Sequence, residues 1–134
     1  MITIRKALIL SGLCIAALLS ELAGAQSYPS KTITIVVPTA PGGANDAMAR
    51  IVAQGLSQKL GQPVIVDNKP GANGAIATEF VARAAPDGYT IGMGNFAPLA
   101  VNHALFKKLN FDPFNDIVPI GLIEKGPLIL MVRN

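Results

Sequence analysis

Cysteine, histidine and tryptophan are almost missing from this chain of 134 residues, which has one, one and none of them respectively. Without a second cysteine or histidine, the chain offers neither a disulfide framework nor a cysteine–histidine metal site. The lone His103 also lacks an obvious serine partner for a catalytic triad. Aromatic residues make up only 5% of the sequence, which leaves little material for stacking on nucleic-acid bases.

Charge is scarce as well. Charged residues make up 14% of the chain, and the net charge is +3 at pH 7. Positive charge this mild and scattered argues against nucleic acid as a partner.

The first 25 residues predict a secretory signal peptide. Arg5 and Lys6 give a positive n-region, residues 7–19 form an apolar h-region, and Ala23-Gly24-Ala25 fits the small-residue cleavage site. The apolar run is too short for a comfortable membrane span. Cleavage after Ala25 would also remove Cys14, the only cysteine.

The stretch that follows predicts a strand, a glycine-rich turn and a helix. Ile33–Val37 is rich in β-branched residues and ends at Pro38, which cannot donate to a central ladder. Pro41-Gly42-Gly43 predicts a tight turn, and Asp46 begins a helical pattern that runs to about Leu60. The free N–H groups and positive dipole end of such a helix suit an anion. The loop alone is equally compatible with an ordinary turn between a strand and a helix.

The pattern of a strand followed by a loop of small residues occurs twice more in the sequence. Val64–Val66 predicts a strand followed by the loop Asp67–Gly74 and a helix over Ala75–Ala84; Tyr89–Met93 predicts a third strand followed by the loop Gly94–Pro98. This repetition predicts an α/β fold with a parallel sheet flanked by helices. Ligands bind at the carboxyl ends of such strands, so the three loops should converge on one site. The apolar residues expected on one side of each helix are Met48, Ile51, Val52, Leu56 and Leu60 in the first and Ile76, Phe80 and Val81 in the second.

Beyond the third loop the pattern weakens. Leu99–Leu109 is expected to form a short helix with Lys107 and Lys108 near its end, where cations suit the helix dipole. A proline-containing loop is expected over residues 110–119, with strands at Ile120–Ile123 and Leu128–Val132. We expect the fold to continue past the last of these strands.

Other motifs favour ordinary structural roles. The first loop lacks the Gly-Lys-Ser/Thr of a P-loop, because Ala44-Asn45-Asp46 stands there instead. Gly92-x-Gly94-x-x-Ala97 matches a dinucleotide fingerprint, but Pro98 follows at once and no strong helix opens at the glycines. Asp112 and Asp116 fit solvated turn residues better than a catalytic pair. We therefore predict no catalytic residue, metal site or cofactor.

Several motifs at matching spacing resemble one family, the tripartite tricarboxylate transporter solute-binding proteins, or Bug receptors. The likeness covers essentially the whole mature chain. The motifs are Tyr28-Pro29-Ser30-Lys31, Val37-Pro38-x-Ala40-Pro41-Gly42-Gly43-x-x-Asp46, Gly61-Gln62-Pro63-Val64, Asn68-x-Pro70-Gly71-Ala72, Ala85-Pro86-Asp87-Gly88-Tyr89-Thr90, Phe106-Lys107-Lys108-Leu109 and Asp112-Pro113.

The resemblance implies a type II periplasmic-binding-protein fold, in which two lobes close on a small carboxylate-bearing solute like a Venus flytrap. It also implies a periplasmic location, delivery to the permease subunits of the transporter, and neither catalysis nor a cofactor. Family members are more than twice as long as the mature chain. Residues 26–127 would therefore be the first part of lobe 1, and residues 128–134 would begin the crossing to a second lobe. Two alternatives stay open, a truncated product that binds nothing and a nucleotide-type α/β enzyme domain.

The resemblance implies that backbone N–H groups, hydroxyls and ordered water hold the ligand's carboxylates. The sequence agrees, because none of the three loop segments contains a lysine or arginine: Thr39–Gly43, Gly71–Gly74 and Gly94–Ala97. Asp46 would interact with the dipole of its own helix, orient donor groups in the cleft, or do both. The predicted ligand-binding residues are Thr39, Ala40, Pro41, Gly42, Gly43, Asp46, Asn73, Gly74, Gly94 and Asn95.

Overall fold

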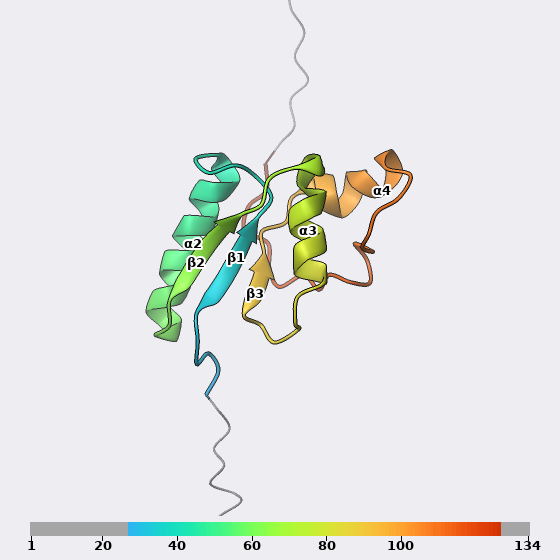
Figure 1. Ribbon diagram of the computed structural model, residues 1–134. Helices are drawn as coiled ribbons and strands as arrows, with labels where there is room; N and C mark the ends of the chain where they lie inside the picture. Colours follow the sequence, from blue (N-terminus) through green and yellow to red (C-terminus); the bar gives the residue numbers. More distant parts are fainter. Residues whose placement is uncertain (1–26, 127–134) are drawn as a thin grey trace, which may run out of the picture.

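The computed structural model describes residues 27–126, and its centre is a three-stranded parallel sheet (Figure 1). The strands are β1 (Ile33–Val37), β2 (Val64–Asn68) and β3 (Thr90–Gly92), in the spatial order β2-β1-β3. Ile33 lies opposite Val64, and Thr34 lies opposite Thr90. The predicted α/β class with a parallel sheet flanked by helices is confirmed.

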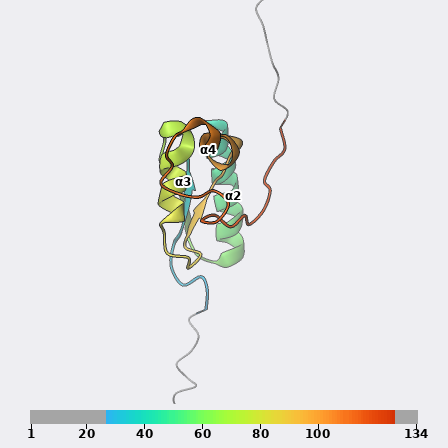
Figure 2. The ribbon, with the colours of Figure 1, turned by 90° about the vertical axis from the view of Figure 1, so that its right-hand side faces the viewer.

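Helices cover both faces of the sheet. In the order β2-β1-β3 the connections β1→β2 and β2→β3 run in opposite directions, so right-handed crossovers place their helices on opposite faces. Figure 2 shows α2 (Ala44–Leu60) and α3 (Ala75–Ala82) on opposite sides of the strands. The short 3₁₀-helix η1 (Ala72–Gly74) precedes α3, and the π-helix η2 (Ala97–Val101) runs into α4 (Asn102–Leu105) after β3. Within residues 27–126, none of these helices has the length and apolarity to cross a membrane.

The core lies between α2 and the sheet. Ile35 and Val37 of β1 are buried against Ala49 and Ala53 of the helix, with partly buried apolar residues around them. The helix therefore contacts the sheet through alanines, whose small side chains permit a close approach. The prediction that Ile51 belongs to the core-facing side was wrong, because this side chain is 64% exposed.

On the other face, α3 also buries small residues, Ala77 and Thr78. Ile76 and Phe80, predicted to share an apolar side of the helix, are about half exposed instead. The Lys69 ammonium lies 4.3 Å from the centroid of the Phe80 ring, so a cation–π contact covers part of this ring. A local apolar pattern did not reveal that alanine and threonine make the tighter contact.

Element boundaries differ from the predictions mainly after η2. Phe106 has extended backbone angles, so α4 ends at Leu105, and the prediction that Lys107 and Lys108 lie in a helix was wrong. Ile120–Ile123 forms no strand, since no described strand pairs with it and its apolar side chains are exposed. The predicted signal peptide and the predicted strand Leu128–Val132 lie outside the described residues.

Smaller boundary differences occur in the three repeats. The first helix begins two residues before Asp46, at Ala44, and β2 extends beyond the predicted strand to Asn68. Helix α3 ends at Ala82, two residues early. Each difference is a frayed or extended end of an element whose existence and type were predicted.

Candidate functional site

The three predicted loops meet at the carboxyl edge of the sheet (Figure 1). Gly74, at the end of the second loop, packs between Pro38 of the first loop and Pro98 of η2. A Cβ atom added to Gly74 would lie 3.1 Å from Pro98 Cγ and 3.3 Å from Pro38 Cβ. The structure thus brings the loops that follow β1, β2 and β3 into direct contact.

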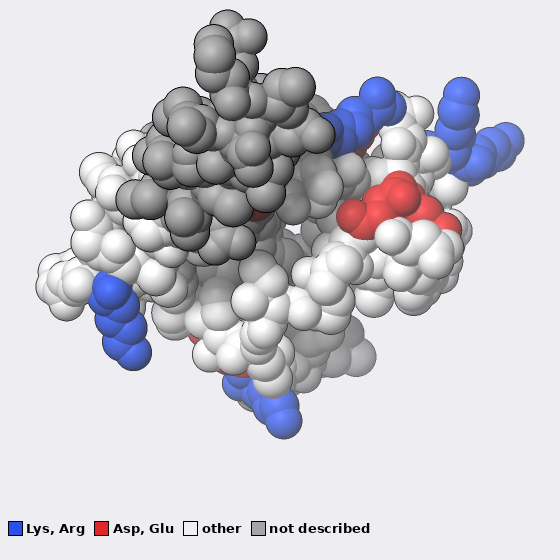
Figure 3. Space-filling model, turned by 90° about the horizontal axis from the view of Figure 1, so that it is seen from below, with Lys and Arg blue, Asp and Glu red and all other residues white. Residues whose placement is uncertain are grey.

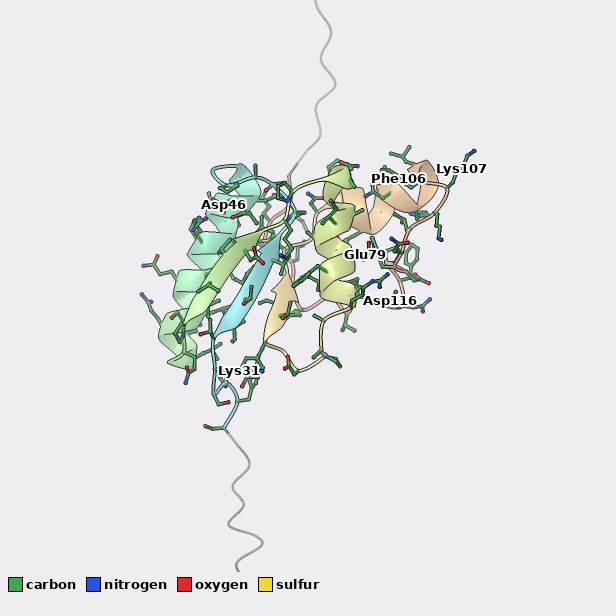
Figure 4. All side chains as sticks on the ribbon, in the orientation of Figure 1. Lys31, Asp46, Glu79, Phe106, Lys107 and Asp116 are labelled. Atoms are coloured by element: carbon green, nitrogen blue, oxygen red, sulfur yellow. The ribbon has the colours of Figure 1, made fainter. Side chains whose placement is uncertain are left out.

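The carboxylate of Asp46 holds the first loop in place through hydrogen bonds. Its Oδ2 accepts hydrogen bonds from the Gly42 amide at 2.9 Å and from Arg50 Nε at 3.0 Å. Its Oδ1 accepts from Arg50 Nη2 and from Asn68 Nδ2, both at 3.0 Å. Figure 4 shows Asp46 at the upper end of α2, close to the carboxyl ends of the strands. With both oxygens occupied and only 3% of the residue exposed, Asp46 holds the loop in shape.

Asn68 extends this network to β2. The same Nδ2 atom that reaches Asp46 also donates to the Thr39 carbonyl at 3.0 Å. One side chain at the end of β2 therefore ties together the loop after β1 and the first turn of α2.

The Arg50 hydrogen bond and the Gly42 amide lower the pKa of Asp46 from 3.8 to about 2. A carboxyl whose pKa falls on folding stabilises the native state above its unfolded pKa and loses that contribution as pH falls through the native pKa. We therefore expect Asp46→Asn to be less stable than the parent at neutral pH and the difference to shrink between pH 3.8 and about 2. Urea unfolding of both proteins at several pH values measures this. A difference that stays constant down to pH 2 would contradict the role of the ionised carboxylate.

The first turn of α2 carries free donors. Gly43 is the N-cap residue and no side chain caps the helix. The first intrahelical bond runs from the Ala47 amide to the Gly43 carbonyl at 2.9 Å. The amides of Ala44 and Asn45 therefore have no intrahelical acceptor, and they carry the partial positive charge of the helix dipole.

The two glycines of the first loop have different roles. Gly42 has φ = +85°, a conformation that favours glycine. Gly43 has φ = −81° and ψ = 171°, angles that any residue adopts. The turn thus requires glycine at position 42, whereas the absence of a side chain at position 43 leaves the helix amides accessible.

Thr39 contributes a buried hydroxyl next to this turn. Its Oγ1 atom has no hydrogen-bond partner among the described residues. It would lie 3.9 Å from a Cβ atom placed on Gly43. Because a buried hydroxyl without a partner is costly, a bound polar group would satisfy it.

The second loop has a strained backbone. Ala72 and Asn73 both have left-handed angles, with φ of 45° and 52°. Asn73 Nδ2 donates to Asn102 Oδ1 at 2.8 Å, so the side chain is directed at α4. Asn73 therefore has a structural contact in addition to its predicted place in the site.

The third loop serves its own helix. Asn95 Oδ1 accepts from the Ala97 amide at 3.1 Å, a local turn just before η2. A Cβ atom on Gly94 would lie 2.5 Å from Leu99 Cδ1. The glycine of the fingerprint Gly92-x-Gly94-x-x-Ala97 is thus packed against this leucine and offers no cradle for a diphosphate.

Sequence reasoning missed Arg50, Asn68 and Asn102 as residues that shape the site. The four-residue spacing of Asp46 and Arg50 is that of helical ion pairs and was a usable signal. Asn68 belongs to the motif Asn68-x-Pro70-Gly71-Ala72, which does not by itself indicate a bond to Asp46. Asn102 stands in an undistinguished apolar stretch, and nothing local to the sequence indicates its contact with Asn73.

Cationic side chains do not gather into one patch on the face opposite the loops. Figure 3, which views the molecule from below, shows Lys and Arg spread around the rim of the described surface. Lys31 lies at this end of the sheet (Figure 4) and pairs with Asp87 at 3.4 Å. Among the described residues, no group of acidic, histidine or cysteine side chains has the arrangement of a metal site.

Comparisons with known proteins agree on one family. Residues 48–134 match the family model described as "Tripartite tricarboxylate transporter family receptor". Protein BugT of Bordetella pertussis is 41% identical over 110 residues, which cover 81% of this chain and 34% of BugT. The chain thus spans about a third of the length of the curated relatives it matches.

Solved structures give the same result. MatC from Rhodopseudomonas palustris, determined with bound malate, superposes with a TM-score of 0.68 at 41% identity, covering 72% of this chain and 33% of MatC. A second R. palustris protein, determined with adipate, superposes with a TM-score of 0.63 at 37% identity, covering 65% of this chain and 29% of that one.

Proposed function

The chain belongs to the tripartite tricarboxylate transporter receptor family, and we propose on that premise that it captures a small carboxylate-bearing solute for delivery to the transporter's membrane permease. The family is one of periplasmic solute-binding receptors, which fits the proposed signal peptide and its cleavage after Ala25. Catalysis forms no part of this proposal.

One observation carries the proposal most directly. The loop after β1 presents the uncapped first turn of α2, and Asp46 and Asn68 hold that loop in place. Because the Asp46 carboxylate already has four hydrogen bonds, it leaves the helix amides free for another anion. Gly43 adds no side chain in front of them.

The chemistry favours a carboxylate held by neutral donors. Hydrogen bonds to a charged acceptor contribute roughly 1.5–3 kcal/mol each, and the helix dipole about 0.3–1 kcal/mol more at an exposed site. The amides of Ala44 and Asn45 are the donors available for this, and the buried Thr39 hydroxyl, which has no partner among the described residues, lies beside the same turn. The relatives determined with malate and adipate support a dicarboxylate as the solute.

Equilibrium titration of the protein with malate, adipate, glucose and putrescine tests the proposal. We expect saturable binding of at least one dicarboxylate and none of the neutral sugar or the dication. Binding of putrescine or glucose with no dicarboxylate binding would contradict the proposal, and so would the absence of any binding. The last outcome would favour the alternative that this chain, a third of the relatives' length, is a non-binding product.

A further inference from the structure

The side-chain amide of Asn102, the first residue of α4, is buried and hydrogen-bonds to the second loop. The residue is 0% exposed. Its Oδ1 accepts from Asn73 Nδ2 at 2.8 Å, and its Nδ2 donates to the Asn73 carbonyl at 3.1 Å. Both functional ends of one side chain are therefore used on one residue, 29 positions away in sequence.

Asn73, the partner of Asn102, lies where the described backbone has positive φ at residues other than glycine. Ala72 and Asn73 are the two described residues other than glycine with positive φ. Such angles persist only where surrounding contacts hold them. The pair of bonds from Asn102 acts at this point of the chain.

The segment around Asn102 holds the same loop at a second point. The backbone N–H of Asn102 closes the π-turn of η2 by donating to the Ala97 carbonyl. One residue after Ala97, the Pro98 ring packs against Gly74. Pro98 and Asn102 thus contact the consecutive residues Gly74 and Asn73, so the third loop's helix fixes the end of the second loop.

We propose that Asn102 is a positioning residue of the binding site, which locks the Ala72–Gly74 turn in the conformation that meets the other two loops. The lock itself follows from the geometry of this chain. Its effect on affinity rests on the proposed function and on the prediction that Asn73 and Gly74 line the ligand site.

The chain provides a matched set of variants. Asn102→Ala removes both bonds to the loop. Asn73→Gly removes only the side-chain bond at an exposed position, and glycine accepts the left-handed backbone without strain. Asn110→Ala is the control, because this amide also joins the segment after β3 to α3, through a 3.2 Å bond to Glu79, but away from the loop.

Amide hydrogen exchange at Gly74 gives a readout that needs no ligand, since this amide donates to the Gly71 carbonyl at 2.9 Å within the turn. We expect Asn102→Ala and Asn73→Gly to speed exchange at Gly74 by about tenfold while amides of α2 keep the parent's rates. Asn73→Gly should lower Tm less than Asn102→Ala does, because it removes one of the two bonds and glycine accepts the left-handed backbone. Malate affinity should fall about tenfold in both variants and stay unchanged in Asn110→Ala.

The outcomes separate the possibilities. The proposal would be wrong if Asn73→Gly left amide exchange at Gly74 unchanged. It would also be wrong if the α2 amides exchanged faster by the same factor as Gly74, or if Asn110→Ala sped exchange at Gly74 equally. If Asn102→Ala fails to fold, Asn73→Gly carries the test alone. A parent protein that binds neither malate nor adipate would count against the proposed function, while the exchange measurement would still decide whether Asn102 positions the turn.

Discussion

Replacing Gly74 by alanine is expected to lower the free energy of unfolding by about 3 kcal/mol. Gly74 has φ = +86°, where an alanine is strained by about 1–2 kcal/mol. The new methyl group would also lie 3.1–3.3 Å from carbon atoms of Pro98 and Pro38. Neither proline ring moves easily, because each belongs to another loop of the same edge. Overpacking of this kind costs about 1–3 kcal/mol.

Gly55→Ala is the matched control for this substitution. Gly55 lies inside α2, and nothing lies within 4 Å of a Cβ atom added there. Alanine is the better helix former by about 1 kcal/mol, so this variant should be more stable than the parent. Thermal melts should show Tm falling by more than about 10 °C for Gly74→Ala and rising for Gly55→Ala. A Gly74→Ala protein as stable as the parent would mean that the three loops do not pack at Gly74.

The order of strands, loops and helices was predictable because glycine and proline mark most of the boundaries. Pro38 follows the last residue of β1, and Gly61 has left-handed angles at the end of α2. These are local properties of single residues, and the sequence displays them directly. The convergence of the loops followed in turn from the parallel sheet.

The helix faces and the links between loops were not predictable in the same way. Ile51 and Phe80 fit an apolar face as well as Ala53 and Ala77 do, and only the distance between helix and sheet decides between them. The amide of Asn102 finds its partner 29 residues away. A contact of that range depends on where two elements end in space, which spacing along the chain does not specify.

Gly43→Val is the substitution expected to weaken ligand binding most cleanly. Position 43 has extended backbone angles suited to valine, and an added Cβ atom would meet Ala40 O at 3.6 Å, an ordinary contact. The side chain would instead cover the free amides of the first turn of α2. Loss of one hydrogen bond to a carboxylate costs about 1.5–3 kcal/mol, so we expect affinity to fall tenfold or more, since 1.4 kcal/mol is about tenfold.

The fold of this variant should survive. Valine caps a helix less well than glycine does, but no strain arises at φ = −81°. Gly42→Val would be a poorer choice, because at φ = +85° it would distort the turn itself. Lys107→Ala is the control for charge, since Lys107 lies beyond the end of α4, on the opposite side of the molecule from Asp46 (Figure 4).

Isothermal titration of malate into the parent, Gly43→Val and Lys107→Ala tests most directly whether the uncapped turn of α2 binds the carboxylate. We expect the parent and Lys107→Ala to bind with similar affinity and Gly43→Val to bind at least about tenfold more weakly. Full affinity in Gly43→Val together with a loss in Lys107→Ala would contradict this, because recognition would then depend on surface charge and the site would lie away from the three loops.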